Sequence, residues 1–193
     1  MVDDDWSGYH DATRGASPRD LLVRAAKRLD QPGRVLDLGC GAGNDTRYLL
    51  SLGHQVTAVD AHRDAIDALS ALNEPNLTCM CGSFAEFPLE ASTFDLVSAQ
   101  LALPFNPPET FDAMFARLLT ALAPDGYLAC DLFGIDDAWN TPDSGMTFHT
   151  RTEVERLLMS LDVIQLEEVR EAVRLANGEE HQAHSFEIIA QRR

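Results

Sequence analysis

The sequence predicts one doubly wound α/β domain, in which a mostly parallel sheet is covered by helices on both faces. Short apolar runs alternate with amphipathic helical segments from about residue 17 to residue 160, a spacing typical of a parallel sheet. A glycine-rich turn at residues 39–43 joins the first apolar run to the next helical segment. The length of 193 residues suits a single domain with one sizeable core.

The first half of the alternating region begins with a helix that Ser17 caps and Pro18 opens, because serine caps helices and proline fits their first turn. Gly33, after Gln31 and Pro32, ends this helix. We then expect a buried strand at residues 35–38, a helix at 45–52, a strand at 55–59, a helix at 63–72 and a strand at 76–80.

The second half continues the same alternation. We expect a strand at residues 94–99, a helix that Asn106 caps and that runs to about residue 122, a turn at 124–126 and a strand at 127–132. Thr150 and Glu153 have the spacing of a capping box, in which two side chains pair reciprocally with two backbone N–H groups. A further helix is therefore expected near residues 150–160.

The C-terminal part predicts a β-hairpin. Two β-rich runs, at residues 163–175 and 183–191, flank Asn177 and Gly178, and Asn-Gly between such runs is the strongest short-range hairpin signal. The sheet should therefore have seven strands and end in an antiparallel pair. Residues 1–193 then form one domain, with an N-terminal segment at 1–16, an α/β core at 17–160 and the hairpin at 161–193.

Charge and composition exclude several classes of partner. The chain has 31 acidic and 15 basic side chains, a net charge of −16, which repels phosphate backbones and anionic lipid. We therefore expect neither nucleic acid nor a membrane as a partner. The acidic start of the chain and the lack of a long apolar run argue against a signal peptide or membrane span, and four cysteines without a CxxC pair predict reduced thiols, no metal site and a cytoplasmic location.

The glycine-rich turn predicts a ligand site. Glycines between a strand and a helix let a ligand approach the backbone, and the helix N-terminus offers unpaired N–H groups. Asp60 ends the next strand, 21 residues after Gly39, close to the offset of about 20 residues at which a carboxylate holds ribose hydroxyls. This geometry suits two cofactors, a nicotinamide dinucleotide and S-adenosylmethionine.

Two positions distinguish these cofactors. Asn44 stands where the dinucleotide pattern has its last glycine. Asp37, just before the glycines, would repel a pyrophosphate but suits a ligand with an ammonium group. S-adenosylmethionine carries an ammonium and a ribose and has no phosphate, so the residues favour S-adenosylmethionine.

The stretch Asp37-Leu38-Gly39-Cys40-Gly41-Ala42-Gly43 resembles motif I of the class I S-adenosylmethionine-dependent methyltransferases, which have a Rossmann-like fold. Residues 56–60 resemble the second strand of that family, residues 94–97 its fourth strand, and residues 122–128 the turn into its fifth. Within the superfamily, the short chain and the terminal hairpin resemble the small tellurite-resistance-type methyltransferases. The resemblance implies an enzyme that methylates a small molecule and leaves S-adenosylhomocysteine.

The resemblance also implies residue roles. Asp37 would face the methionine ammonium, Asp60 the ribose diol, and Gln100 would lie near the methionine end. Ser83 stands where many members have an aspartate beside the adenine, and a hydroxyl can accept the same hydrogen bond. The implied cofactor-binding residues are Asp37, Gly39, Cys40, Gly41, Gly43, Asp60, Ala61, Ser83, Phe84 and Gln100.

The sequence leaves the catalytic residues undetermined. A hydroxyl acceptor needs a general base and a thiol does not, so a dedicated catalytic residue is optional. The candidates for a catalytic residue are Tyr9, His10 and His149. Residues 1–16 are either a lid over the cofactor or a terminus packed on the surface, and residues 133–148 are expected to shape the acceptor pocket. His181 and His184 are predicted to be solvated or structural.

Two other functions stay open at this point. The chain is either a methyltransferase or a non-catalytic S-adenosylmethionine-binding protein, with a nicotinamide-dependent oxidoreductase as a third alternative. The methyl acceptor, the atom methylated (oxygen, nitrogen, sulfur or a metalloid) and the oligomeric state are left open by the sequence.

Overall fold

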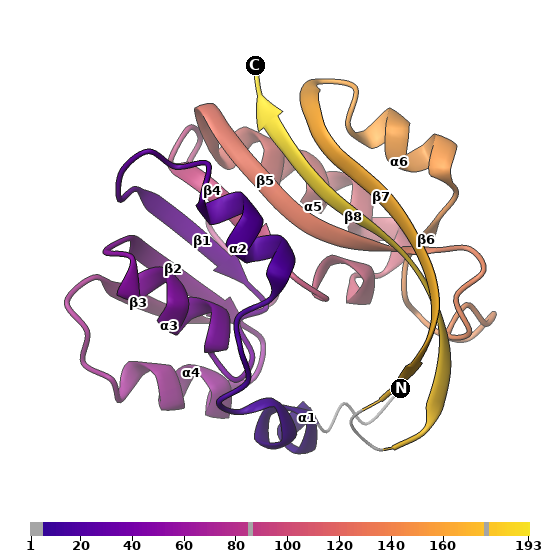
Figure 1. The fold of residues 1–193 in the computed structure, drawn as a ribbon, viewed down its shortest axis with the longest axis horizontal. Helices are drawn as coiled ribbons and strands as arrows, with labels where there is room; N and C mark the ends of the chain where they lie inside the picture. The colour runs from indigo at the N-terminus through magenta and orange to yellow at the C-terminus, as the bar shows by residue number, and fades with distance from the viewer. Residues whose placement is uncertain (1–5, 85–86, 176–177) are drawn as a thin grey trace.

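A computed structural model describes residues 6–84, 87–175 and 178–193 and contains one mixed sheet (Figure 1). The strand order is β3-β2-β1-β4-β5-β8-β7, and a short strand β6 also pairs with β5. All pairings are parallel except those that β8 makes with β5 and β7. The predicted fold class is confirmed, and the sheet has eight strands because β6, Phe148–His149, was not expected.

The expected long strands are all present. Their bounds are β1 Arg34–Leu38, β2 Gln55–Asp60, β3 Leu77–Cys81, β4 Phe94–Ala99, β5 Leu122–Gly134, β7 Leu161–Arg174 and β8 Glu180–Arg192. The helices are α1 Trp6–Thr13, α2 Asp20–Ala26, α3 Asn44–Ser51, α4 Arg63–Ser70, the 3-10 turn η1 Leu103–Phe105, α5 Pro108–Ala121 and α6 Arg151–Leu157.

Two hydrophobic layers cover the sheet because neighbouring residues of each strand point to opposite faces. Val35 packs with α2 and α3, whereas Leu36 packs with α5 and α6. The α4 helix joins the α2 side through Ile66 and Leu69. Because β1 to β5 pair in parallel, their carboxyl ends lie at one edge of the sheet. Helix α1 lies beside that edge, at the bottom of Figure 1.

Two helices begin at other residues than the sequence predicts. Ser17 does not cap α2: the N-cap is Arg19, whose backbone N–H donates to Oδ1 of Asp45 at 2.9 Å. A side chain from α3 thus replaces the expected local cap. Likewise α5 begins after Pro107 rather than after Asn106, whereas the capping box of Thr150 at α6 is confirmed.

The turn expected before the fifth strand lies within β5. The register between β4 and β5 shifts here, between Phe94 and Leu96, and Asp125 has a φ of +61°. A Cβ on Gly126 would lie 2.9 Å from the carbonyl oxygen of Phe94, so only glycine fits. The turn is an irregularity in a longer strand and not an interruption.

The C-terminal hairpin is confirmed, and its far end extends past the rest of the sheet. β8 pairs with β5 from Gln191 to Ser185, but it pairs with β7 up to Glu180. Asn177 lies outside the described residues, while Gly178 has the positive φ, +88°, that a tight turn requires. No helix in the described part of the chain is long and apolar enough to cross a membrane.

Candidate functional site

The glycine turn after β1 forms the floor of the candidate site. The N–H groups of Gly39 and Cys40 both donate to the carbonyl oxygen of Val59, at 2.8 and 3.1 Å, which ties the turn to the end of β2. Gly39 and Gly43 have φ values of +76° and +78°. Side chains there would also collide with Ala102 and Leu69, at 2.6 and 2.4 Å. Both positions therefore require glycine.

Asp60 joins this turn to the start of α4. Its Oδ2 accepts a hydrogen bond from the Gly41 N–H at 2.8 Å, and its Oδ1 accepts one from the His62 N–H at 2.9 Å. The side chain of His62 also lies beside the carboxylate, with Nδ1 3.1 Å from Oδ1. The carboxylate expected to hold a ribose is thus buried at the edge of the turn, and it also supports the helix start.

Asp37 lies on the α3 side of β1 and is only 2% exposed. The hydroxyl of Thr46 donates to its Oδ2. Burial, and then the nearby charge of Asp45, raise the pKa of Asp37 from 3.8 to about 7. A cation placed beside this carboxyl would favour its ionised form, because opposite charges lower the pKa of an acid.

The other predicted contact residues lie around the same edge. The Gly82 N–H donates to the Asp60 carbonyl at 2.9 Å, so the ends of β2 and β3 are adjacent, with Ala61 and Ser83 exposed. The Phe84 ring reaches within 3.5 Å of the position that a Cβ on Gly39 would take.

Cys40 and Gln100 have their side chains buried in the fold. Cys40 packs with residues of α4 and is 7% exposed, and burial raises the pKa of its thiol. The Gln100 amide donates to the carbonyl oxygen of Ala129 at 3.1 Å, so this amide points toward β5. The Nε2 group of Gln100 is therefore already used within the fold.

The N-terminal segment packs against the glycine turn as helix α1. The His10 ring comes within 3.4 Å of the Cβ position on Gly41. Asn44 holds the connection to α2, because its Oδ1 accepts from the Gly15 N–H at 3.0 Å and its Nδ2 donates to the Thr13 carbonyl at 2.8 Å. The Tyr9 hydroxyl accepts from Arg19 at 2.9 Å. Residues 1–5 of the expected lid lie outside the described residues.

Folding brings together three side chains that could hold a metal ion, a site that sequence spacing did not suggest. One ligand atom from each of His10, Asp60 and His62 lies within 4.8 Å of the others. Both oxygens of Asp60 already accept backbone hydrogen bonds, and burial lowers the pKa of His10. The two imidazoles come from α1 and the start of α4, so no local motif could have indicated this group.

His149 and His184 are both buried in the fold. His149 is buried against Phe111, with ring centroids 4.7 Å apart, and burial lowers its pKa. Nδ1 of His184 accepts from the Asp136 N–H at 3.0 Å, and Nε2 lies 3.1 Å from Glu168. A Cβ on Gly134 would come within 2.2 Å of the His184 ring.

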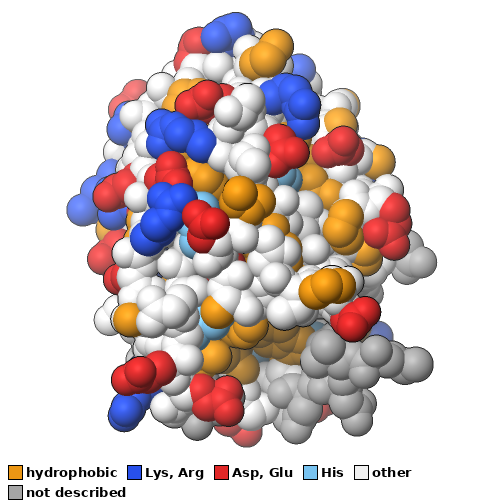
Figure 2. All heavy atoms as spheres, turned by 90° about the vertical axis from the view of Figure 1, so that its right-hand side faces the viewer, with side chains coloured by type: hydrophobic (Ala, Val, Ile, Leu, Met, Phe, Trp, Pro, Cys, Tyr) orange, Lys and Arg blue, Asp and Glu red, His pale blue; other side chains and the backbone are white. Residues whose placement is uncertain are grey.

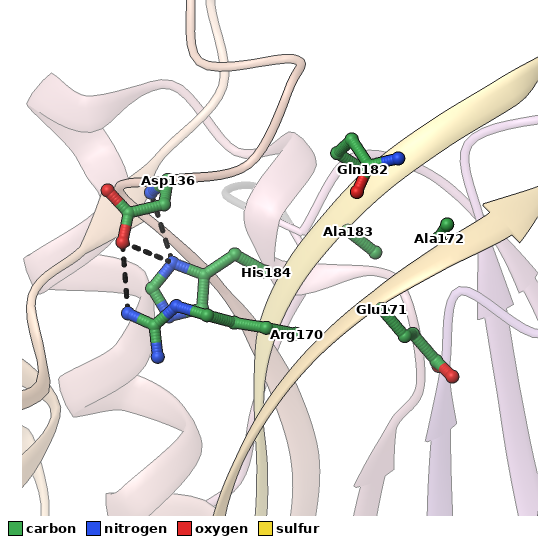
Figure 3. Close-up of a pocket in the computed structure, with 7 residues that line it drawn as sticks. All are labelled: Asp136, Arg170, Glu171, Ala172, Gln182, Ala183 and His184. Carbon is green, nitrogen blue, oxygen red and sulfur yellow. Dashed lines mark hydrogen bonds and ion pairs between the residues drawn. The ribbon is translucent and has the colours of Figure 1, made fainter.

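These contacts form one wall of a hollow of about 280 Å³ (Figure 3). Asp136 points toward both His184 and Arg170 in this view, whereas Glu171 points away from them. His184 and Arg170 are each paired with carboxylates. These pairs, which line the hollow, hold the hairpin to the loop after β5. It lies apart from the glycine turn in the fold.

The known proteins that this chain resembles are methyltransferases. A model of the methyltransferase domain matches residues 35–126, from β1 into β5. The chain is 29% identical over 132 residues to an uncharacterized methyltransferase of Staphylococcus carnosus, covering 64% of this chain and 62% of that protein. It is 34% identical over 119 residues to the trans-aconitate 2-methyltransferase of Rhizobium meliloti, covering 59% of this chain and 43% of that protein.

Solved structures agree with this match. The 1,6-didemethyltoxoflavin-N1-methyltransferase of Burkholderia thailandensis superposes with a TM-score of 0.73 and 25% identity, over 96% of this chain and 84% of the other. Residues 35–126 thus match the methyltransferase domain, and the chain has the fold of the class I S-adenosylmethionine-dependent methyltransferases.

The chain matches these proteins over part of their length. It spans less than two thirds of the length of the first curated relatives it matches, 62% and 46% of them. TehB from Haemophilus influenzae has a TM-score of 0.75 but 21% identity, over 89% of this chain and 61% of the other. The resemblance to TehB, at this identity, is therefore one of fold.

Proposed function

We propose that the protein transfers a methyl group from S-adenosylmethionine to a small-molecule acceptor at the carboxyl ends of β1, β2 and β4. The observation that carries the proposal is the placement of Asp60, whose carboxylate lies directly against the glycine turn. Relatives named as methyltransferases of small molecules, and a similar structure crystallised with S-adenosylhomocysteine and its acceptor, support it.

The residues of the site fit S-adenosylmethionine better than a nicotinamide dinucleotide. Asp37 is buried on the β1 side of the turn and has a raised pKa, so it would gain from a neighbouring ammonium and oppose a pyrophosphate. Asn44 takes the place of the last dinucleotide glycine, and its amide is used to hold the connection to α2. The cradle at Gly39 and Gly43 leaves no room for side chains.

S-adenosylmethionine supplies an electrophilic methyl carbon on a sulfonium. The chain's own contribution is to bind, orient and exclude water, which accounts for much of the acceleration in a displacement reaction. In this proposal Asp60 holds the ribose, and Asp37 faces the ammonium. Cys40 and the glycines of the turn contact the cofactor through their backbone. Ala61, Ser83 and Phe84 surround the adenine, and the backbone of Gln100 lies at the methionine end.

Helix α1 would act as a cover for the ribose side of the site. His10 lies over Gly41, and Tyr9 is fixed by Arg19. In this proposal Tyr9 and His10 close the site over the cofactor. The whole chain is a single domain, in which the α/β core and the C-terminal hairpin follow helix α1. The acidic charge supports a small molecule rather than nucleic acid or a membrane as the partner. The four cysteines, none of them in a CxxC pair, support the cytoplasm as the location.

Calorimetry on the full chain tests the cofactor. S-adenosylmethionine and S-adenosylhomocysteine should bind and raise the melting temperature, whereas NAD should do neither, because only a ligand of the native state stabilises it. Binding of NAD without binding of S-adenosylmethionine would refute the proposal. An acceptor screen that follows S-adenosylhomocysteine release then separates an enzyme from a non-catalytic binding protein, since the latter binds the cofactor without turnover.

A further inference from the structure

Five aromatic side chains from five separate segments form one connected group at the sheet edge. We call it the aromatic cluster, and its members are Trp6 of α1, Phe105 of η1, Phe133 of β5, Trp139 of the next loop and Phe148 of β6. Phe105 is its centre, with ring centroids 4.8 Å from Trp6, 5.7 Å from Phe133 and 6.3 Å from Trp139. Phe133 also stacks on Phe148 at 5.9 Å.

The aromatic cluster is separate from the hydrophobic layers of the fold. None of its five members belongs to the three core clusters found among the described residues. Only Phe133 is fully buried, and the other four rings are partly exposed. Figure 2 shows hydrophobic side chains on the floor of a hollow low on the face that carries the hairpin. Large apolar surface left open in a concave place is typical of a ligand site.

The cluster continues directly from the proposed cofactor site. The Trp6 ring lies 6.3 Å from the ring of His62, which in turn touches Asp60. Phe105 follows β4 and Phe133 lies near the end of β5. The two regions therefore share the edge at which ligands bind in such sheets.

A histidine–aspartate pair lies at the far side of the aromatic cluster. The His181 ring packs on Trp139 with centroids 4.3 Å apart, and its Nε2 is 3.0 Å from Oδ1 of Asp137. Asp137 is fixed by the backbone N–H groups of Trp139 and His184, at 2.9 and 3.0 Å. A carboxylate held this way fixes the orientation of the imidazole and leaves Nδ1 outside the ion pair.

The charge of this region restricts the acceptor. The five side chains of the aromatic cluster carry no charge, and the Asp137 carboxylate at its far side is paired with His181. An acceptor with several carboxylates would lose its hydration here without a compensating cation. A flat uncharged ring, by contrast, stacks on aromatic side chains.

We propose that the aromatic cluster binds a planar aromatic acceptor whose O–H or N–H is directed at His181. The proposal rests on the proposed function and names its substrate class. The acceptor oxygen or nitrogen forms the new bond to the methyl carbon as the sulfonium–methyl bond breaks. Nδ1 of His181 takes the acceptor's proton, and neutral S-adenosylhomocysteine leaves.

Acceptor binding is tested by calorimetry on the full chain already saturated with S-adenosylhomocysteine. Failure to bind the cofactor is then seen in the first titration and failure to bind an acceptor probe in the second. The aromatic probes are 2-naphthol, 5-hydroxyindole and lumazine; the controls are 2-decalol, the saturated counterpart of 2-naphthol, and trans-aconitate. We expect at least one aromatic probe to bind and 2-naphthol to exceed 2-decalol by about tenfold in affinity. Binding of S-adenosylhomocysteine without any aromatic probe, or preference for trans-aconitate, would overturn the proposal.

Variants locate the probe and assign the proton. Trp139→Leu should weaken probe binding by about tenfold, Trp139→Phe should retain most of it, and neither should alter binding of S-adenosylhomocysteine. His181→Gln should bind the probe normally but lower kcat for 2-naphthol by about 10²–10⁴-fold and remove the loss of rate at acid pH. Equal binding by the leucine variant, or a wild-type pH profile in His181→Gln, would refute the assignment.

Discussion

Replacing Asp37 by asparagine should change how the stability of the protein depends on pH. Burial, followed by the charge of Asp45, raises the pKa of Asp37 from 3.8 to about 7, against the opposing hydrogen bond from Thr46. Between these values the folded state binds more protons than the unfolded state. The free energy of unfolding must therefore fall as the pH rises through this window.

The size of the effect follows from the shift. About three pKa units at about 1.4 kcal/mol each give roughly 4 kcal/mol of stability lost between about pH 4 and pH 8. Burial also raises the pKa of Asp131, to about 7, and that of Asp45, so three acids contribute to the slope in the native protein. The lowered pKa values of His10, His54 and His149 oppose this slope below about pH 6.5. Asp37→Asn should remove the contribution of Asp37 and make the protein more stable than wild type at about pH 8.

Urea unfolding followed by circular dichroism at several pH values measures this slope. The matched control is Asp125→Asn, at an exposed turn position, which should unfold with the wild-type pH dependence. An Asp37→Asn variant whose free energy of unfolding falls with pH as steeply as that of the wild type would show that Asp37 is ionised at little cost. The same variant should bind S-adenosylmethionine more weakly, since the ammonium of the cofactor loses the carboxylate of Asp37 as its charged partner.

Three further outcomes are expected. Asp60→Ala should weaken S-adenosylhomocysteine binding by about 1.5–3 kcal/mol in calorimetry, while the exposed Asp64→Ala should not; equal affinities would place the ribose elsewhere. Gly43→Ala should lower the melting temperature more than Gly15→Ala, because both glycines have a positive φ but only Gly43 would also collide with a neighbour, at 2.4 Å; equal losses would mean that backbone strain alone matters. Deleting residues 1–10 should preserve the core and abolish methyl transfer, because the cover over the site is lost; full activity in the truncated chain would remove α1 from the mechanism.

The sequence determined the fold because its signals are local. The apolar run at β1, the glycines after it and the hairpin glycine Gly178 each act within a few residues, and each has the expected conformation. The cap at Ser17 was wrong because the donor at the start of α2 is bound by Asp45, which lies on another helix. Strand β6 was not predicted because only pairing with β5 makes two residues a strand.

The tertiary structure alone decided the surroundings of the site. The sequence placed Asp60 after β2, but only folding put the rings of His10 and His62 beside it. The sequence predicts His181 to be a solvated or structural histidine, and only the fold places Asp137, more than 40 residues earlier in the chain, against it. Such contacts join segments whose local patterns are independent of one another, so no periodicity or spacing encodes them. They arise because the parallel strands end at one edge and bring the following loops together there.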